Sequence, residues 1–209
     1  MDDIVNQAIA KWPNVPHCYG WLSLDARGAW RMRDERAQAL GLAGERIVHA
    51  ALLGFINRNY AHDVRGCWYF QNGPQRVYVN LEATPYIAHT DLVEGAQASD
   101  SSLHFCLHTG EPIPIIHHAW MTEAGQLVLD CAGKIALVDD RDMARCVADF
   151  RINNIPATDE QLMAWLAQSP QSSNLMLLYA GVQIPVGLMP RESMATHFGF
   201  IQLPLATTC

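Results

Sequence analysis

The residues of this chain best suited to chemistry are histidines and a cysteine that alternate over residues 103–108. If this segment is a strand, His104, Cys106 and His108 point to one face, because successive side chains of a strand alternate. An imidazole within hydrogen-bond reach of a thiol can activate it as a nucleophile. We therefore take these three as candidate catalytic residues, with a buried structural cysteine as the alternative.

The same segment offers ligands for a zinc-like metal ion. Imidazole nitrogen and thiolate sulfur are preferred zinc ligands, and His117 or His118 of the next expected strand could join His104 and Cys106. The two outer histidines of one flat strand would lie about 13 Å apart, which is too far for a single ion. A metal site therefore needs a cross-strand histidine, and the alternative is a row of hydrogen-bonded histidines without metal.

The sequence motifs of several common enzyme classes are absent. The chain contains no phosphate-binding loop, no dinucleotide-binding fingerprint, no Gly-x-Ser-x-Gly and no His-Glu-x-x-His. Its six cysteines are widely spaced and form no Cys-x-x-Cys pair, so we expect reduced thiols rather than a disulfide framework. Glu45 and His49, four residues apart on a predicted helix, are expected to be an ordinary polar pair.

The clearest element of secondary structure in the sequence is a β-hairpin, which is predicted within residues 66–90. Two runs rich in aromatic and β-branched residues flank the turn formers Asn72, Gly73 and Pro74. Because Pro74 has no N–H to donate, we expect a four-residue loop rather than a two-residue turn. The expected cross-strand pairs are Trp68 with Val79, Tyr69 with Tyr78, Phe70 with Val77, and Gln71 with Arg76.

This hairpin also carries candidate binding residues. Tyrosine, tryptophan and arginine are enriched at binding surfaces, and the outward face is expected to hold Tyr69, Arg76 and Tyr78. We take these three residues together with Trp68 as candidates for contact with a ligand or partner. The alternative is that the helix predicted over residues 44–60 covers the outward face.

The rest of the chain mixes helices and hairpins without regular strand–helix–strand alternation. This pattern favours an α+β fold with a largely antiparallel sheet of hairpins covered by about four helices, in a single domain over residues 1–209. The expected helices span residues 2–12, 44–60, 139–150 and 158–168, the last opened by a capping box of Thr158 and Gln161. Further strands are expected near residues 19–24, 29–32, 103–108, 114–121, 126–131 and 134–138, with a break or sheet edge at Pro185.

Composition and charge limit the classes of partner. The chain has 209 residues, of which 50% are hydrophobic, and this is ample for a packed core. Fourteen basic residues against twenty-one acidic ones give a net charge of −7, which argues against non-specific nucleic-acid binding. No segment supplies the roughly 20 consecutive apolar residues of a membrane span, and no secretory signal is recognisable, so a soluble cytoplasmic protein is expected.

Two stretches resemble an uncharacterised proteobacterial family of similar length. Residues 65–79 read RGCWYFQNGPQRVYV, and residues 123–130 read EAGQLVLD. The likeness covers most of the chain, and it implies a bacterial origin. It transfers no activity, cofactor or catalytic residue.

The functional prediction is a small ligand-binding or protein-interaction domain without catalytic activity. No cofactor, nucleic acid or membrane is expected as a partner, and a homodimer is compatible with this prediction. The alternative is a metal- or thiol-dependent enzyme that uses the histidine and cysteine residues of the strands within residues 103–118.

Overall fold

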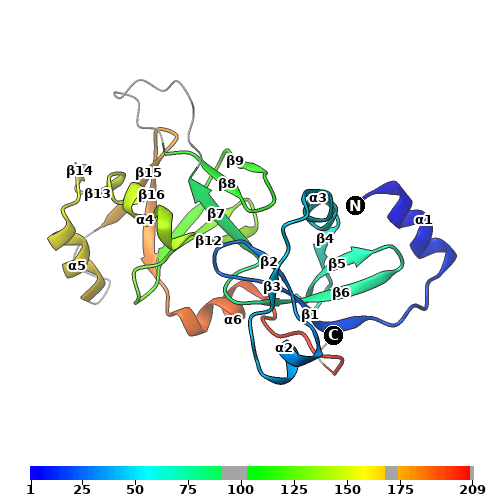
Figure 1. The fold of residues 1–209 in the computed structure, drawn as a ribbon. Helices are drawn as coiled ribbons and strands as arrows, with labels where there is room; N and C mark the ends of the chain where they lie inside the picture. Colours follow the sequence, from blue (N-terminus) through cyan, green and yellow to red (C-terminus); the bar gives the residue numbers. More distant parts are fainter. Residues whose placement is uncertain (91–102, 168–173, 208–209) are drawn as a thin grey trace. The chain divides into compact units, whose positions relative to one another are not determined.

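The computed structural model describes residues 1–90, 103–167 and 174–207 (Figure 1). The chain divides into two compact units, which are described separately below. Unit 1 comprises Met1–Pro85 and Ala195–Cys209, and unit 2 comprises Tyr86–Met194. Each unit is built on one mostly antiparallel sheet, which confirms the α+β class in its coarse form. A division by contacts does not test whether the units fold independently, so the single domain stays a prediction.

Unit 1 contains a six-stranded sheet with the order β3-β2-β1-β6-β5-β4. Its strands are β1 (Cys18–Leu24), β2 (Trp30–Met32), β3 (Glu45–Arg46), β4 (Tyr60–His62), β5 (Trp68–Asn72) and β6 (Gln75–Leu81). The central pair β1 and β6 is parallel, and the other neighbours are antiparallel. The sheet therefore combines the predicted hairpin with a parallel contact between segments distant in sequence.

The predicted hairpin forms between β5 and β6, but its loop is shorter than expected. The register pairs Tyr69 with Tyr78, Phe70 with Val77 and Gln71 with Arg76, as predicted. Asn72 also pairs with Gln75, so Gly73 and Pro74 form a two-residue turn and the four-residue loop was wrong. Gly73 takes a φ of +57°, which glycine tolerates, and Pro74 occupies a turn position from which no ladder hydrogen bond is required.

The helices of unit 1 are shorter than their sequence patterns suggest. They are α1 (Asp3–Lys11), α2 (Glu35–Ala39), α3 (Ala50–Arg58) and α6 (Met194–Phe198), the last of which begins at the boundary residue Met194. The helix predicted over residues 44–60 starts only at Ala50, because Nδ1 of His49 caps it by accepting a hydrogen bond from the Leu52 N–H at 3.3 Å. Glu45 lies in β3, so Glu45 and His49 do not share a helix.

Both faces of the hairpin are covered by other parts of unit 1. Helix α3 packs on one face, where the rings of Phe55 and Phe70 meet edge to face at 5.4 Å. Ile201 packs against the opposite face, and its N–H donates to the Gly66 carbonyl at 3.0 Å. Helix α3 therefore lies on the face opposite to the one that the sequence-based alternative gave it.

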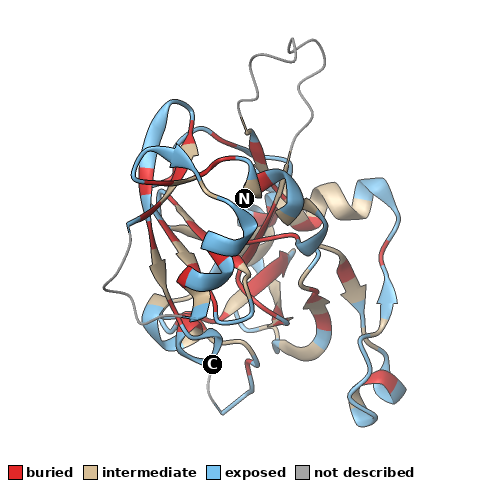
Figure 2. Cartoon of the chain, turned by 90° about the vertical axis from the view of Figure 1, so that its left-hand side faces the viewer, coloured by how far each residue is buried: buried red, intermediate tan, exposed pale blue. Residues whose placement is uncertain are grey.

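Unit 2 contains a ten-stranded sheet with the order β14-β13-β15-β16-β10-β11-β12-β7-β8-β9. Its strands are β7 (Tyr86–Thr90), β8 (Phe105–Leu107), β9 (Pro112–Ile113), β10 (His118–Met121), β11 (Leu127–Cys131), β12 (Lys134–Val138), β13 (Phe150–Ile152), β14 (Ile155–Pro156), β15 (Leu175–Tyr179) and β16 (Val182–Leu188). Two neighbouring pairs, β7 with β12 and β10 with β16, are parallel. Buried positions follow the strands, whereas exposed positions dominate the turns (Figure 2).

Two details of unit 2 differ from the sequence-based expectation. Only residues 118–121 of the strand expected near residues 114–121 form a strand, β10, and β8 pairs with β7 and β9 rather than with β10. Pro185 marks neither a break nor an edge, because it lies inside β16 opposite Met176 of β15. Pairing of β16 with β10 begins only at Val186, so the missing N–H of Pro185 interrupts no ladder there.

The helices of unit 2 lie between and after its strands. They are the 3₁₀ helix η1 (Asp140–Asp142), α4 (Met143–Val147), α5 (Asp159–Ala167) and the 3₁₀ helix η2 (Arg191–Ser193). The predicted capping box forms at α5, where Thr158 N–H donates to Gln161 Oε1 at 2.9 Å and Gln161 N–H donates to Thr158 Oγ1 at 3.2 Å. The described ranges thus hold six α-helices rather than about four, because short helices follow β2 and β16. None of them is long and apolar enough to span a membrane.

Candidate functional site

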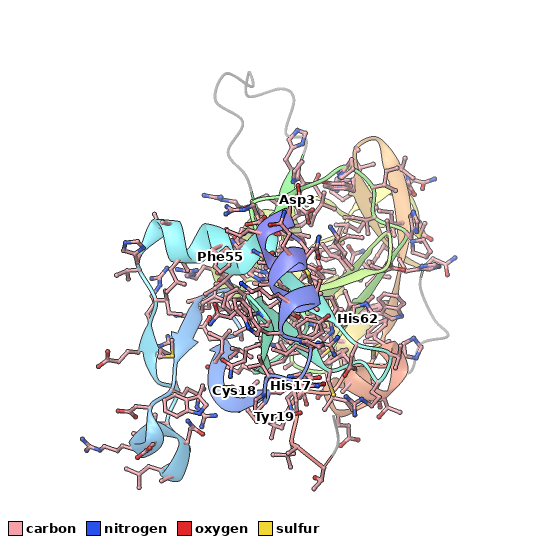
Figure 3. All side chains as sticks on the ribbon, turned by 90° about the vertical axis from the view of Figure 1, so that its right-hand side faces the viewer. Asp3, His17, Cys18, Tyr19, Phe55 and His62 are labelled. Carbon is pink, nitrogen blue, oxygen red and sulfur yellow. The ribbon has the colours of Figure 1, made fainter. Side chains whose placement is uncertain are left out.

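Three of the four predicted binding residues meet in one group of side chains in unit 1. We call His17, Tyr19, Tyr69, Arg76 and Tyr78 the tyrosine–arginine cluster. The rings of Tyr19 and Tyr78 stack at 4.7 Å with an interplanar angle of 5°, and Tyr69 meets Tyr78 edge to face at 5.7 Å. The parallel pairing of β1 with β6 brings His17 to the same tyrosine, with ring centroids 5.8 Å apart. Figure 3 shows His17, Cys18 and Tyr19 close together where the chain enters β1.

Arg76 provides the positive charge of this cluster. Its guanidinium carbon lies 4.5 Å from the ring centroid of Tyr69, a cation–π arrangement. Burial lowers the pKa of Arg76, but a hydrogen bond with Tyr78 and the fields of Tyr69, Tyr78 and the nearby Asp63 carboxylate outweigh it, so the net pKa is raised. No carboxylate of the described residues forms a salt bridge with this guanidinium. Arg76 is therefore a permanently charged, half-buried cation.

Trp68, the fourth predicted binding residue, lies elsewhere. Its ring contacts those of Tyr60 at 4.8 Å and His62 at 4.7 Å, on the neighbouring strand β4. Successive residues of a strand face opposite sides, so Trp68 and Tyr69 point away from each other. Trp68 is thus separated from the tyrosine–arginine cluster by the sheet itself.

The loop before β5 holds the hydroxyl end of Tyr78 in the cluster. The hydroxyl of Tyr78 donates to Asp63 Oδ2 at 3.2 Å, while Asp63 Oδ1 accepts from the backbone N–H groups of Arg65 and Cys67. Asp63 also forms an ion pair with Arg65 at 2.8 Å. Burial raises the pKa of Asp63, but the hydrogen bonds from Arg65 and Cys67 outweigh this effect. The net pKa of Asp63 therefore lies below its usual range, and the carboxyl group is ionised at pH 7. The carboxylate of Asp63 is therefore occupied by its bonds to Tyr78 and Arg65.

His17 responds to the positive field of the cluster. Burial lowers the pKa of this imidazole, and the nearby charges of Arg76 and Arg65 lower it further. The neutral imidazole is therefore favoured at pH 7, with one nitrogen that can donate and one that can accept.

Only part of the tyrosine–arginine cluster can meet a ligand. Tyr69 and Tyr78 are 6% and 0% exposed, so they form its interior. His17 is exposed, and Tyr19 and Arg76 are half-buried. The accessible side thus offers a neutral imidazole, a phenol ring and a guanidinium, a combination that suits an anionic group attached to an apolar one.

The histidine and cysteine candidates of unit 2 are only partly brought together. Cys106 lies half-buried in β8, with exposed His104 just before that strand. His108 directly follows β8 and bonds to the backbone of β7. Its ring Nδ1 accepts a hydrogen bond from the Ile87 N–H at 3.2 Å, and its backbone N–H donates to the Ile87 carbonyl at 2.7 Å. His108 is therefore engaged in strand pairing.

The histidines proposed to complete a metal site lie on another part of the sheet. His118 begins β10, with His117 before it, and three strands separate β10 from β8 in the sheet order. Nδ1 of His118 lies 3.5 Å from Asp130 Oδ2 instead. Across the described part of the chain, no group of three histidine, cysteine, aspartate or glutamate side chains has an arrangement that could hold a metal ion.

The structure places a different histidine beside Cys106. His89 of β7 pairs directly with Cys106 of β8. Nδ1 of His89 lies 3.3 Å from Asp139 Oδ2 and 3.7 Å from Asp142 Oδ2. The sequence places Asp139 at the start of a predicted helix, but it does not show that β7 and β12 lie side by side. We call Cys106, His89 and Asp139 the thiol row.

Asp139 is the buried member of the thiol row. Its side chain is 1% exposed and forms an ion pair with Arg141. Burial raises the pKa of Asp139, but side-chain and backbone hydrogen bonds from Arg141 outweigh it, so the pKa is lowered well below the usual range. Asp139 is therefore a charged, fixed partner for the ring of His89.

The cysteines differ in their surroundings. Burial raises the pKa of both Cys131 and Cys146 to about 12, so these thiols are inert. Cys18 and Cys106 are half-buried thiols. Cys67 is disulfide-bonded, so the expectation that all cysteines are reduced was wrong.

An open cavity of about 540 Å³ lies elsewhere in unit 1, beside α2. Its lining includes Met32, Arg36, Leu42 and Glu45. None of the residues singled out from the sequence as catalytic, metal-binding or ligand-binding candidates lines this cavity.

The fold defines an α+β protein built on two mostly antiparallel sheets. A family model described as "Protein of unknown function (DUF2946)" and labelled DUF2944 matches residues 1–205, and the chain belongs to this family. The resemblance to an uncharacterised family is thereby confirmed. No curated protein matches the chain.

One solved structure supports the fold, and a second shows a weaker likeness. A DUF1285 family protein from Silicibacter pomeroyi DSS-3 is similar with a TM-score of 0.50 and 17% identity, covering 93% of this chain and 98% of that one. A DUF1285 family protein from Shewanella baltica OS155 is similar with a TM-score of 0.38 and 14% identity, covering 58% of this chain and 85% of that one. The first likeness concerns the fold alone, and the second is too weak to carry an argument.

Proposed function

We propose that unit 1 binds a small ligand with a carboxylate or phosphate group at the accessible side of the tyrosine–arginine cluster. The observation that carries this proposal is the guanidinium of Arg76, which is half-buried, stacked on Tyr69 and without a salt bridge to any described carboxylate. Arginine binds planar anionic groups through paired N–H donors, and a partly desolvated guanidinium gains most from such a partner.

The surrounding side chains favour an anion over a cation. The charge of Arg65, which is itself paired with Asp63, lies near enough to His17 to lower the pKa of that imidazole. The carboxylate of Asp63 is occupied by Arg65 and by backbone N–H groups. Neutral His17 can add a hydrogen bond, and Tyr19 offers an apolar ring beside the charge.

The binding role needs little movement of the protein. Tyr69 and Tyr78 are buried and hold Arg76 and Tyr19 in place through ring contacts. Such a preorganised cation loses little side-chain entropy when an anion binds.

Equilibrium binding of inorganic phosphate and of benzoate to the full chain tests this proposal. We expect saturable binding of at least one probe with a dissociation constant of about 1 mM, weakened by added salt. Arg76→Ala should abolish it. Arg46→Ala, which removes an equal charge from the exposed edge strand β3, should leave it unchanged.

Two outcomes would contradict the proposal. One is the absence of saturable binding of both probes to the unaltered chain. The other is equal binding to Arg76→Ala and Arg46→Ala, which would show that the anion responds to net charge rather than to this cluster.

A further inference from the structure

Three side chains with complementary chemistry lie in one row across neighbouring strands of unit 2. Cys106 is in β8, His89 is in β7, and Asp139 directly follows β12. The sheet order β12-β7-β8 puts the histidine in the middle. The row therefore offers a thiol, an imidazole and a buried carboxylate in the order that an activated nucleophile requires.

The register fixes the first contact of this row. His89 and Cys106 are directly opposite each other in an antiparallel pair, so their side chains project from the same face of the sheet. Directly opposed Cβ atoms lie about 5 Å apart. An imidazole at this position can reach the sulfur through its second nitrogen.

The second contact orients the imidazole. Nδ1 of His89 faces Asp139 Oδ2 at 3.3 Å, which favours a proton on Nδ1. Nε2 then has a lone pair that can take a proton from a thiol on the β8 side of the ring. The buried carboxylate, held in turn by Arg141, would also stabilise the imidazolium that forms.

We propose that Cys106 is a nucleophile for acyl transfer, with His89 as its general base and Asp139 as a positioning residue. The sulfur attacks the carbonyl carbon of an ester or thioester, and its proton moves to Nε2 of His89. A C–S bond forms, the bond from carbon to the leaving group breaks, and the leaving group takes the proton from His89. Water then attacks the carbonyl carbon of the S-acyl intermediate and gives a proton to Nε2 of His89. The C–S bond breaks, the carboxylic acid is released, and the sulfur takes the proton back from His89, which restores the thiol.

The charges around the row favour an uncharged acyl group. Arg141 is paired with Asp139, and Arg145 lies 3.7 Å from Asp142. Asp142 also accepts hydrogen bonds from the backbone and side chain of Thr90. Both arginines at the row thus have a carboxylate partner, whereas Arg76 of unit 1 forms no salt bridge with a described carboxylate. The thiol row thus goes beyond the anion binding proposed for unit 1.

The chain contains its own controls for this proposal. Cys18 is half-buried like Cys106, but its strand partner in β6 is Val77, which cannot act as a base. Cys131 and Cys146 are buried. Selective reaction at Cys106 therefore cannot be explained by exposure alone.

Reaction of the full chain with p-nitrophenyl acetate, followed by release of p-nitrophenolate and by peptide mass spectrometry, tests the assignment. We expect acetylation of Cys106 well ahead of Cys18. His89→Gln should slow acetylation of Cys106 by about 10²-fold to 10⁴-fold, the contribution of a general base. Cys18→Ala should leave the rate at Cys106 unchanged.

A spectroscopic measurement separates the positioning role of Asp139 from a structural one. The ¹⁵N shifts of the His89 ring should show the proton on Nδ1, and Asp139→Asn should move it towards Nε2 in protein with unchanged circular dichroism. Equal acetylation of Cys106 and Cys18, or an unchanged rate at Cys106 in folded His89→Gln protein, would overturn the proposal.

Discussion

The tyrosine–arginine cluster of unit 1 and the thiol row of unit 2 are both built across three neighbouring strands, yet they differ in kind. The first surrounds an arginine that has no salt bridge to a described carboxylate, and its tyrosines are buried. The second surrounds a histidine already held by a buried carboxylate. An unbalanced cation suits the binding of an anion, whereas an oriented imidazole suits proton transfer. This difference in ionic partners is the reason that we propose binding at the first group and catalysis at the second.

The largest loss of stability is expected where the backbone at Gly66 closely approaches the backbone at Gly199. Gly66 has a φ of +81°, and a Cβ there would overlap the carbonyl oxygen of Gly199. Gly66→Ala should lower the free energy of unfolding by about 3 kcal/mol and loosen the cover of Tyr78, as measured by urea denaturation. Gly110→Ala has a similar φ and an open surrounding, so it should cost only about 1 kcal/mol. Equal losses in both variants would contradict the close approach.

The next effect concerns the buried carboxylate of the thiol row. Asp139→Asn should destabilise the chain by about 2 kcal/mol at pH 7, because Arg141 loses its charged partner. The folded-state pKa of Asp139 is lowered, so its stabilisation is present above the unfolded pKa of about 3.9 and is lost as the pH falls through the folded-state pKa.

Denaturation at several acidic pH values tests this second prediction. The unaltered chain should lose more stability than Asp139→Asn as the pH falls below about 4. Glu160→Gln, at an exposed position in the first turn of α5, should follow the unaltered chain. Identical acid profiles of all three would contradict the role given to Asp139.

A smaller effect is expected at the hydrogen bond between Tyr78 and Asp63. Tyr78→Phe keeps the stacked ring but removes the 3.2 Å bond, so the loss should be about 1 kcal/mol of unfolding free energy. Tyr19→Phe is the matched control, because no hydrogen bond of its hydroxyl appears within the described residues. If chemical denaturation gives the same value for both variants, the hydroxyl of Tyr78 does not fix the cluster.

The smallest effect is a change in titration alone. Arg76→Ala removes a positive charge that disfavours protonation of His17, so the pKa of His17 should rise towards its ordinary value of about 6.5. An NMR titration of the imidazole signals measures this directly. An unchanged pKa of His17 in Arg76→Ala would contradict the proximity of the guanidinium and the imidazole.

The two regions also differ in how far the sequence reveals them. The pairing of Tyr69 with Tyr78 follows from alternation within one hairpin, and it was predicted in register. The turn was misjudged because Pro74 was taken to need a longer loop, although the positive φ of Gly73 makes a two-residue turn possible. Patterns within one hairpin therefore suffice to predict the contact between Tyr69 and Tyr78 in the tyrosine–arginine cluster.

Contacts between distant segments were beyond local rules. His17 and Tyr19 reach Tyr78 only through the parallel pairing of β1 with β6. His89 meets Asp139 only because β7 and β12 are parallel neighbours, and the sheet order places three strands between His118 of β10 and Cys106 of β8. Alternating residues define the face of a strand but not its neighbour, so the base beside Cys106 could not be predicted.

The central claim is that Arg76 makes the tyrosine–arginine cluster a site for anions. The most direct test is a titration of the full chain with inorganic phosphate and, separately, benzoate, observed by NMR at the imidazole signals of His17 and His89. We expect that at least one anion shifts the His17 signals saturably, that Arg76→Ala abolishes the shift, and that the His89 signals stay in place. A His17 signal that neither anion moves, or that moves equally in Arg76→Ala, would contradict the claim.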